Sequence, residues 1–237
     1  MIEETILQFV RGDIDFGAFF EEYRKNKKVI QCLENMVACL GDKGVFVTYD
    51  AVFRANFPAE KAEYYIQRNR SDHTDVVVPN KNFPTVKSLM DHFINSNCSS
   101  FMKRSEIYNL IFSIVVAAEP DTVYYHKYSD DFEFFIRAVP DYVAGGEEAC
   151  NYIEKEVVPN IPSDISEAQR IRLCREMVKQ SFHVAGSKYP RWAQSAEWPI
   201  VNGKPARYLG YKRKGDLAEC MFEDTITGEP ITVKQYY

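Results

Sequence analysis

The sequence predicts an α+β fold: a mostly helical body, residues 1–188, carries a small C-terminal antiparallel β-meander, residues 189–237, in one compact unit. Apolar residues recur at helical spacing through most of the body. Near the end, three short runs rich in β-forming residues are separated by Gly, Pro, Asn and Asp turn signals. Both tryptophans, Trp192 and Trp198, lie where these two patterns meet.

The N-terminal part of the chain predicts three short amphipathic helices. The first ends at Gly12, the second begins at Asp13 or Asp15, and the third ends at Gly41. Helices this short cannot bury their apolar stripes alone. We therefore expect them to pack on the segments that follow.

Further helices are indicated by their end signals. Pro58 and Pro84 each suit the first turn of a helix. The run from Asp164 to Glu167 fits a capping box, and Gly186 fits the end of the long helix that this box opens. The most apolar helix is expected to be central. The expected ranges are 58–70, 105–118 (the apolar helix), 147–158 and a long helix that runs from the box at 164–167 to Gly186, with a loop over 69–83.

Two stretches leave helix and strand open. Residues 45–47 could begin a strand, although the spacing of apolar residues through residue 57 favours a helix. Residues 122–128 are rich in β-forming side chains, and residues 132–139 suit either a strand or a helix. The meander itself is clearer, because turn signals bound its three runs, 206–211, 217–222 and 231–236.

Charge is distributed unevenly. The chain carries a net charge of −5, yet residues 188–237 hold eight basic and six acidic residues, which leaves −7 upstream. The most acidic segment, 119–156, has ten carboxylates against Lys127, Arg137 and Lys155. These acids either solvate helix faces or form a surface for a basic partner. For the second case, the candidate partner-binding residues are Glu119, Asp121, Asp130, Asp131, Glu133, Glu147 and Glu148.

No stretch of the sequence indicates a catalytic centre. Glycine-rich phosphate loops, G-x-S-x-G and H-E-x-x-H are all missing. The 6 cysteines form no C-x-x-C pair and the 4 histidines share no ligand spacing, so we expect no metal and no cofactor. The carboxylate pairs Asp130–Asp131 and Glu147–Glu148 could serve acid–base chemistry, but adjacent acids more often solvate a surface. The expectation is a protein that is not an enzyme.

Localisation and nucleic-acid binding can also be judged from the sequence. The N-terminus lacks the basic region of a signal peptide, and the longest apolar run, 110–118, is too short to cross a bilayer. We therefore expect a cytoplasmic, reduced protein with no membrane partner. A nucleic-acid site would need a basic stripe. The candidates for it, which nearby acids dilute, are Lys204, Arg207, Lys212, Arg213 and Lys214, so no nucleic-acid partner is expected.

The C-terminal segment contains a pattern of Trp, Pro and Gly residues. It has P-R-W-A-Q at 190–194, E-W-P at 197–199, N-G-K-P at 202–205, F-E-D-T-I-T-G-E at 222–229 and Q-Y-Y at 235–237. This pattern resembles a module of immunity proteins from bacterial polymorphic-toxin systems. The residues that carry it are Trp192, Gln194, Glu197, Trp198, Pro199, Gly203, Pro205, Asp224, Gly228 and Gln235.

The resemblance implies a function and has one departure. Proteins of this family bind and neutralise a cognate toxin domain without catalysis. Leu209-Gly210-Tyr211 stands where such modules usually have Phe or Ile followed by Gln. The alternatives are an interaction or regulatory module with another protein partner and, less favoured, an enzyme of unrecognised class. For the two indoles, the sequence favours a structural role at the seam between helices and meander over a platform for a partner.

Overall fold

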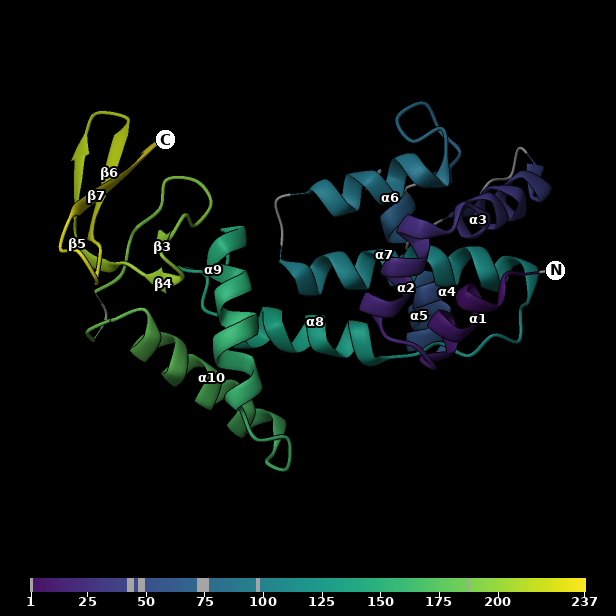
Figure 1. The fold of residues 1–237 in the computed structure, drawn as a ribbon, viewed down its shortest axis with the longest axis horizontal. Helices are drawn as coiled ribbons and strands as arrows, with labels where there is room; N and C mark the ends of the chain where they lie inside the picture. The colour runs from purple at the N-terminus through teal and green to yellow at the C-terminus, as the bar shows by residue number, and fades with distance from the viewer. Residues whose placement is uncertain (1, 42–44, 47–49, 72–76, 97–98, 187) are drawn as a thin grey trace. The chain divides into compact units, whose positions relative to one another are not determined.

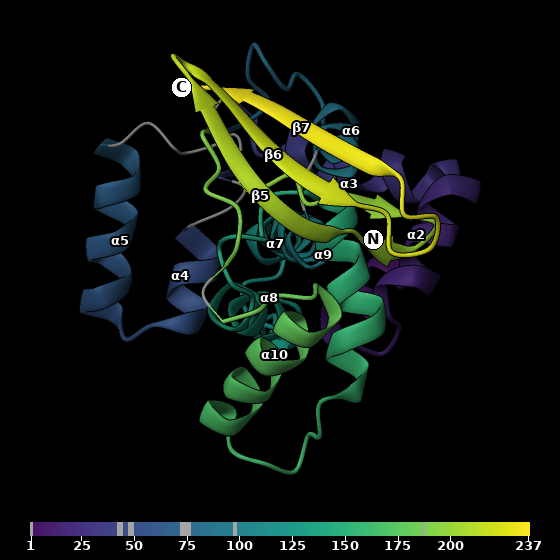
Figure 2. The same ribbon diagram turned by 90° about the vertical axis from the view of Figure 1, so that its left-hand side faces the viewer.

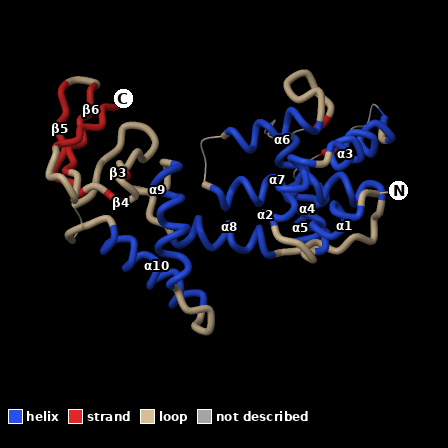
Figure 3. The backbone as a smooth tube through the Cα atoms, in the orientation of Figure 1, coloured by secondary structure: helices blue, strands red, loops and turns tan. Residues whose placement is uncertain are grey.

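The computed structural model describes residues 2–41, 45–46, 50–71, 77–96, 99–186 and 188–237 (Figure 1). It confirms the α+β class: in the described part of the chain, ten α-helices precede a three-stranded antiparallel sheet at the C-terminal end (Figure 3). The chain forms two compact units. Unit 1 comprises Met1–Ser96 with Met102–Ser129, and unit 2 comprises Asn97–Phe101 with Asp130–Tyr237.

Unit 1 begins with the three short helices that the sequence predicts. They are α1 (Glu4–Arg11), α2 (Phe16–Lys25) and α3 (Lys27–Cys39). Gly12 ends α1 in the left-handed conformation, with φ of 81°. Asp15 caps α2, because its carboxylate accepts a hydrogen bond of 2.8 Å from the Ala18 amide. The third helix ends at Cys39, two residues before the expected Gly41.

The next part of unit 1 contains α4 (Asp50–Asn56), α5 (Ala59–Ser71) and α6 (Val86–Asn95). The helix favoured for residues 45–57 is present only from Asp50 onward. Before it, β1 (Val45–Phe46) pairs antiparallel with β2 (Val77–Val78), while residues 47–49 lie outside the described residues. Val45 and Phe46 thus pair with residues more than thirty positions later in the chain, and the local spacing of apolar residues does not reveal this pairing.

The core of unit 1 is organised around α7 (Ser100–Ala118), the helix expected to be central. Tyr108 on this helix is fully buried, and its hydroxyl donates to the Val10 carbonyl (2.9 Å) while accepting from the Tyr125 amide (2.7 Å). Phe9 stacks on Phe19, with ring centroids 4.2 Å apart, and meets Tyr108 edge-on at 5.6 Å. Aromatic packing therefore ties the N-terminal helices to α7.

Residues 122–128, which the sequence leaves open despite their β-forming side chains, do not form a strand. They run as an irregular segment into α8 (Lys127–Ala138), which also settles residues 132–139 as helical up to Ala138. The Tyr125 amide bonds to a tyrosine hydroxyl instead of a strand neighbour. Tyr124 and Tyr128 are buried against the Tyr108 ring, so their β-forming character reflects aromatic burial and not a hydrogen-bonded ladder.

Unit 2 contains one interrupted helix and one long helix. The first starts as α9 (Glu147–Tyr152), widens into a π-helical turn (Ile153–Val157) and ends in a 3₁₀ turn (Val158–Asn160). The second, α10 (Glu167–Ser181), is capped reciprocally by Ser166 and Gln169, two residues later than the expected box at Asp164. It ends well before Gly186.

The sheet of unit 2 has the order β5 (Arg207–Lys214), β6 (Leu217–Glu223), β7 (Pro230–Tyr236), and its strands lie side by side in Figure 2. A hairpin of β3 (Ile200–Val201) and β4 (Lys204–Pro205) precedes it. The side chains of β6 alternate, so that Ala218, Cys220 and Phe222 face the core. That core also contains Phe182 and Trp198, so the expected boundary at residue 188 falls inside unit 2.

Candidate functional site

The segment before the β3–β4 hairpin has no regular structure, and two indoles fix its path. Trp198 is 2% exposed, and its Nε1 donates to the Ala206 carbonyl at 2.9 Å. Trp192 is half-buried, and its Nε1 donates to the Tyr142 carbonyl at 2.9 Å. Both rings also pack against Phe222 of β6. Each indole therefore contributes apolar area and one directed hydrogen bond to the same core.

Gln235 fastens the last strand to this irregular segment. The side-chain oxygen of this buried residue accepts hydrogen bonds from the amides of Ala193 (2.9 Å) and Gln194 (3.0 Å), and its nitrogen donates to the Ser195 carbonyl (2.7 Å). In the other direction, the Gln194 side chain donates a hydrogen bond of 3.1 Å to the Tyr236 carbonyl. A single amide thus satisfies three consecutive backbone groups that have no strand or helix to bond to.

The hairpin and the β6–β7 turn explain other residues of the pattern. Asn202 and Gly203 both have positive φ, 50° and 75°, as a two-residue hairpin turn requires. Asp224 accepts from the Ile226 amide (2.8 Å) and from the Thr227 hydroxyl (2.9 Å), and these bonds hold the pKa of its carboxyl below the usual value. Gly228 completes that turn with φ of 76°.

Most of the pattern that carries the resemblance therefore makes contacts inside unit 2. Pro199 accepts a hydrogen bond of 3.0 Å from the Ala206 amide through its carbonyl, and Pro205 is buried. Glu197 differs, because it is exposed. The geometry assigns these residues to holding an irregular segment, a hairpin and a sheet together.

The predicted acidic residues are distributed over both units. Glu119 and Asp121 are exposed in unit 1, just after α7. The other five belong to unit 2: Asp130, Asp131 and Glu133 lie on α8, and Glu147 and Glu148 lie in the first turn of α9. Of these five, Asp131 and Glu147 are half-buried and the rest are exposed. The structure thus presents acids on two helices of unit 2.

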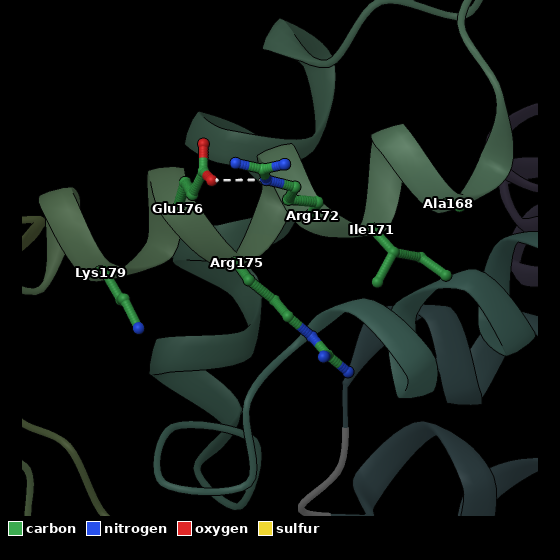
Figure 4. Close-up of a pocket in the computed structure, with 6 residues that line it drawn as sticks. All are labelled: Ala168, Ile171, Arg172, Arg175, Glu176 and Lys179. Atoms are coloured by element: carbon green, nitrogen blue, oxygen red, sulfur yellow. Dashed lines mark hydrogen bonds and ion pairs between the residues drawn. The ribbon is translucent and has the colours of Figure 1, made fainter. Parts of the chain in front are cut away.

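A first hollow of unit 2 lies along α10 and has a volume of about 340 Å³ (Figure 4). Its polar side chains are largely engaged with the protein itself. Arg172 pairs with Glu176 at 3.0 Å, and Arg175 donates to the Arg137 carbonyl at 2.7 Å. The lining residues are Ala168, Ile171, Arg172, Arg175, Glu176 and Lys179. This basic hollow was not predicted, because its cations are interleaved with acids along the sequence.

A second hollow, of about 350 Å³, lies between α9 with its π-helical turn and the β3–β4 hairpin, which stand next to each other in Figure 1. Of the predicted residues, Glu148 and Gly203 line it. The others were missed: Asn151, Tyr152, Lys155, Glu156 and Ile200. The high charge of segment 119–156 was the available signal for Lys155 and Glu156, whereas the approach of the hairpin has none.

Buried ionisable groups outside these hollows act as parts of the core. Burial raises the pKa of the Cys174 and Cys220 thiols to about 11, so both stay protonated and unreactive near neutral pH. Burial also raises the pKa of Glu106, on α7, to about 7.

Within the described ranges, no group of three or more His, Cys, Asp or Glu residues is placed to hold a metal ion. No helix in the described part of the chain has the length and apolarity needed to cross a membrane. Comparison of the chain with protein-family models, curated proteins and solved structures gave no match.

Proposed function

We propose that this chain is a non-catalytic, cytoplasmic immunity protein that binds and neutralises a basic bacterial toxin domain. One observation carries the proposal: the acids on α8 and α9 are mostly solvent-exposed, while the nearby cation Arg137 is already engaged. Arg137 forms an ion pair with Glu167 and accepts a hydrogen bond from Arg175 through its carbonyl. The exposed carboxylates of Asp130, Glu133 and Glu148 therefore keep most of their field available for a partner.

The charge balance supports a basic partner in particular. Upstream of residue 188 the chain carries a net charge of −7. Ten of the carboxylates of this part lie in segment 119–156. An excess of exposed charges of one sign speeds association with a surface of the opposite charge. Many toxin domains of the systems that this chain resembles are basic nucleases, which makes them suitable targets.

The contacts of the C-terminal pattern are consistent with the proposed resemblance. Its tryptophans, glutamines and Asp224 fix the module on which the resemblance to immunity proteins rests. In such a module, the pattern maintains the fold and leaves partner recognition to variable surface residues. The acids of α8 and α9 are surface residues of that kind.

The test is co-expression with the toxin domain encoded beside this chain. We expect rescue of growth, and a stable complex on gel filtration whose association slows as salt is added. Replacing Asp130 and Glu133 together with lysine should slow association at least about tenfold, since the field near α8 is inverted. Asp164, an exposed loop acid of unit 2, provides the control: Asp164→Lys changes the net charge as much as Asp130→Lys alone and should leave association unaltered.

The outcomes separate the candidate functions. Binding that is insensitive to salt and to the α8 reversals would overturn the electrostatic basis of the proposal. Tight binding to a different neighbouring protein, without rescue, would favour the second candidate, an interaction or regulatory module, because the same exposed acids would serve it. Turnover of any substrate that depends on Asp130 or Glu147 would favour the enzyme alternative.

A further inference from the structure

We propose that the hollow between α9 and the β3–β4 hairpin is a socket for one arginine side chain of the protein partner. This inference rests on the proposed function in one respect, namely that the partner is a basic protein. The hollow is formed entirely within unit 2 and has a volume of about 350 Å³. That volume is near the lower limit of ligand sites, roughly 300–1,000 Å³, and so suits a single side chain better than a cofactor.

The polar groups around this hollow are not engaged with the protein itself. Among the described residues, the side chains of Glu148, Asn151, Tyr152, Lys155 and Glu156 form no hydrogen bond or ion pair. In the hollow along α10, by contrast, Arg172 and Arg175 are both bonded to the protein. Convergent polar groups that lack internal partners are available to an outside ligand.

The chemistry of the lining favours a guanidinium group. Glu148 and Glu156 offer two carboxylates, and the Asn151 amide oxygen offers a third acceptor. A guanidinium can bind a carboxylate through two parallel hydrogen bonds, which an ammonium cannot do. Tyr152 adds an aromatic wall, over which a planar cation gains a further attraction.

The local backbone holds these groups in place. Tyr152 is half-buried and meets the buried Phe182 ring edge-on, with centroids 5.6 Å apart, so its ring is supported from behind. The helix changes from α to π at Ile153, between the first and last lining residues of this element. Such turns occur often at functional sites. On the other side, Gly203 stands at the tip of the hairpin without a side chain, so the opening stays clear.

Lys155 is the group that opposes a cation in this socket. It is exposed and unpaired among the described residues, so its ammonium can move toward solvent, but its charge still reduces the attraction. The lining therefore has a net charge of −1. Removal of this lysine should strengthen binding of an arginine. At a site that binds anions, the same removal should weaken binding.

The experiment uses the full chain and a capped tripeptide, acetyl-Gly-Arg-Gly-amide, in an NMR titration that follows the Gly203 amide and the Asn151 side-chain amide. We expect saturable shifts at both. The matched citrulline peptide, which has nearly the same shape and no charge, should bind at least about threefold more weakly, a typical factor for an exposed ion pair. Glu148→Gln should weaken arginine binding by about the same factor, Lys155→Gln should strengthen it about twofold, and Asp164→Asn should leave it unchanged.

Three results would overturn the inference: equal binding of the arginine and citrulline peptides, preferential binding of acetyl-Gly-Glu-Gly-amide, or unaltered binding in Glu148→Gln. All these proteins should fold, because the replaced side chains are exposed. The titration uses no toxin, so its failure is distinguishable from failure of the immunity function. If growth rescue succeeds and the peptide does not bind here, the partner is recognised elsewhere; if the peptide binds and rescue fails, the socket serves another basic protein.

Discussion

The two units are stabilised in different ways. Unit 1 depends on apolar and aromatic packing between helices, with Phe9, Phe19 and Tyr108 at its centre. Unit 2 also has an apolar core, but an irregular segment crosses it, and directed hydrogen bonds from Trp198 and Gln235 fix that segment. Helices and sheets form the hydrogen bonds of their own backbone groups. In an irregular segment, the buried backbone N–H and C=O groups need hydrogen bonds from specific side chains. Single polar residues therefore matter more in unit 2.

The largest effect that would test this contrast is expected for Trp198→Ala. Loss of a buried indole, together with its bond to Ala206, should lower the free energy of unfolding of unit 2 by about 3–5 kcal/mol. The melting temperature should fall by about 10 °C for a chain of this size. Trp192→Ala, at a half-buried position, should cost less. An unchanged melting temperature would mean that Trp198 does not belong to the core.

Tyr108→Phe tests whether unit 1 also depends on a directed bond. The substitution keeps the ring packing but leaves the Val10 carbonyl and the Tyr125 amide without their partner. We expect a loss of about 2–3 kcal/mol, since buried groups left unsatisfied cost roughly 1–3 kcal/mol each. Amide hydrogen exchange would locate the loss in α1 and α7. If exchange is unchanged there, packing alone holds the centre of unit 1.

Gln235 provides the sharpest test of the clamp in unit 2. Gln235→Ala should cost about 2 kcal/mol, because three bonds disappear but the freed backbone groups are partly exposed and can bond to water. Gln235→Glu keeps the two acceptor bonds, and its carboxyl can donate to Ser195 only when protonated, so its cost should be smaller than that of alanine at acid pH, below about 4. Hydrogen exchange at Ala193 and Gln194 should rise in the alanine variant first. Equal stability of both variants would show that the clamp is not limiting.

The smallest effect is expected for Glu106, and it depends on pH. Its pKa is raised to about 7 in the folded protein, above the ordinary value of 4.5, so the folded state binds the proton more tightly. Stability should therefore fall as pH rises from about 4.5 to 7 and stay level above that. The Glu106 side chain is only half-buried and solvent screens its charge, so Glu106→Gln should stabilise unit 1 by less than the full shift implies, about 1–2 kcal/mol at pH 8, with no effect near pH 4. A constant difference across thermal melts at these pH values would contradict this assignment.

Elements with strong local signals were predictable. Gly12, Asp15 and the three β-rich runs mark their elements in the sequence, and the structure confirms them. Segment 122–128 stayed open between strand and helix because its three tyrosines suit a strand and a buried aromatic cluster equally well. Of the residues that line the α9 hollow, only Glu148 and Gly203 were predicted, for other reasons than a shared site. The other side of this hollow comes from a hairpin some fifty residues later in the chain, and local periodicity contains no information about that approach.

The assignment of Phe101 to unit 2 affects how the chain can be divided. This residue is 6% exposed and packs on Phe135 with ring centroids 4.9 Å apart, although the residues on either side of 97–101 belong to unit 1. A fragment that begins at residue 130 would therefore lack one aromatic side chain of its own core. Expressed alone, it would expose the apolar surface that Phe101 covers and tend to aggregate. The two units should therefore be expressed, and fused to other proteins, as one uncut chain.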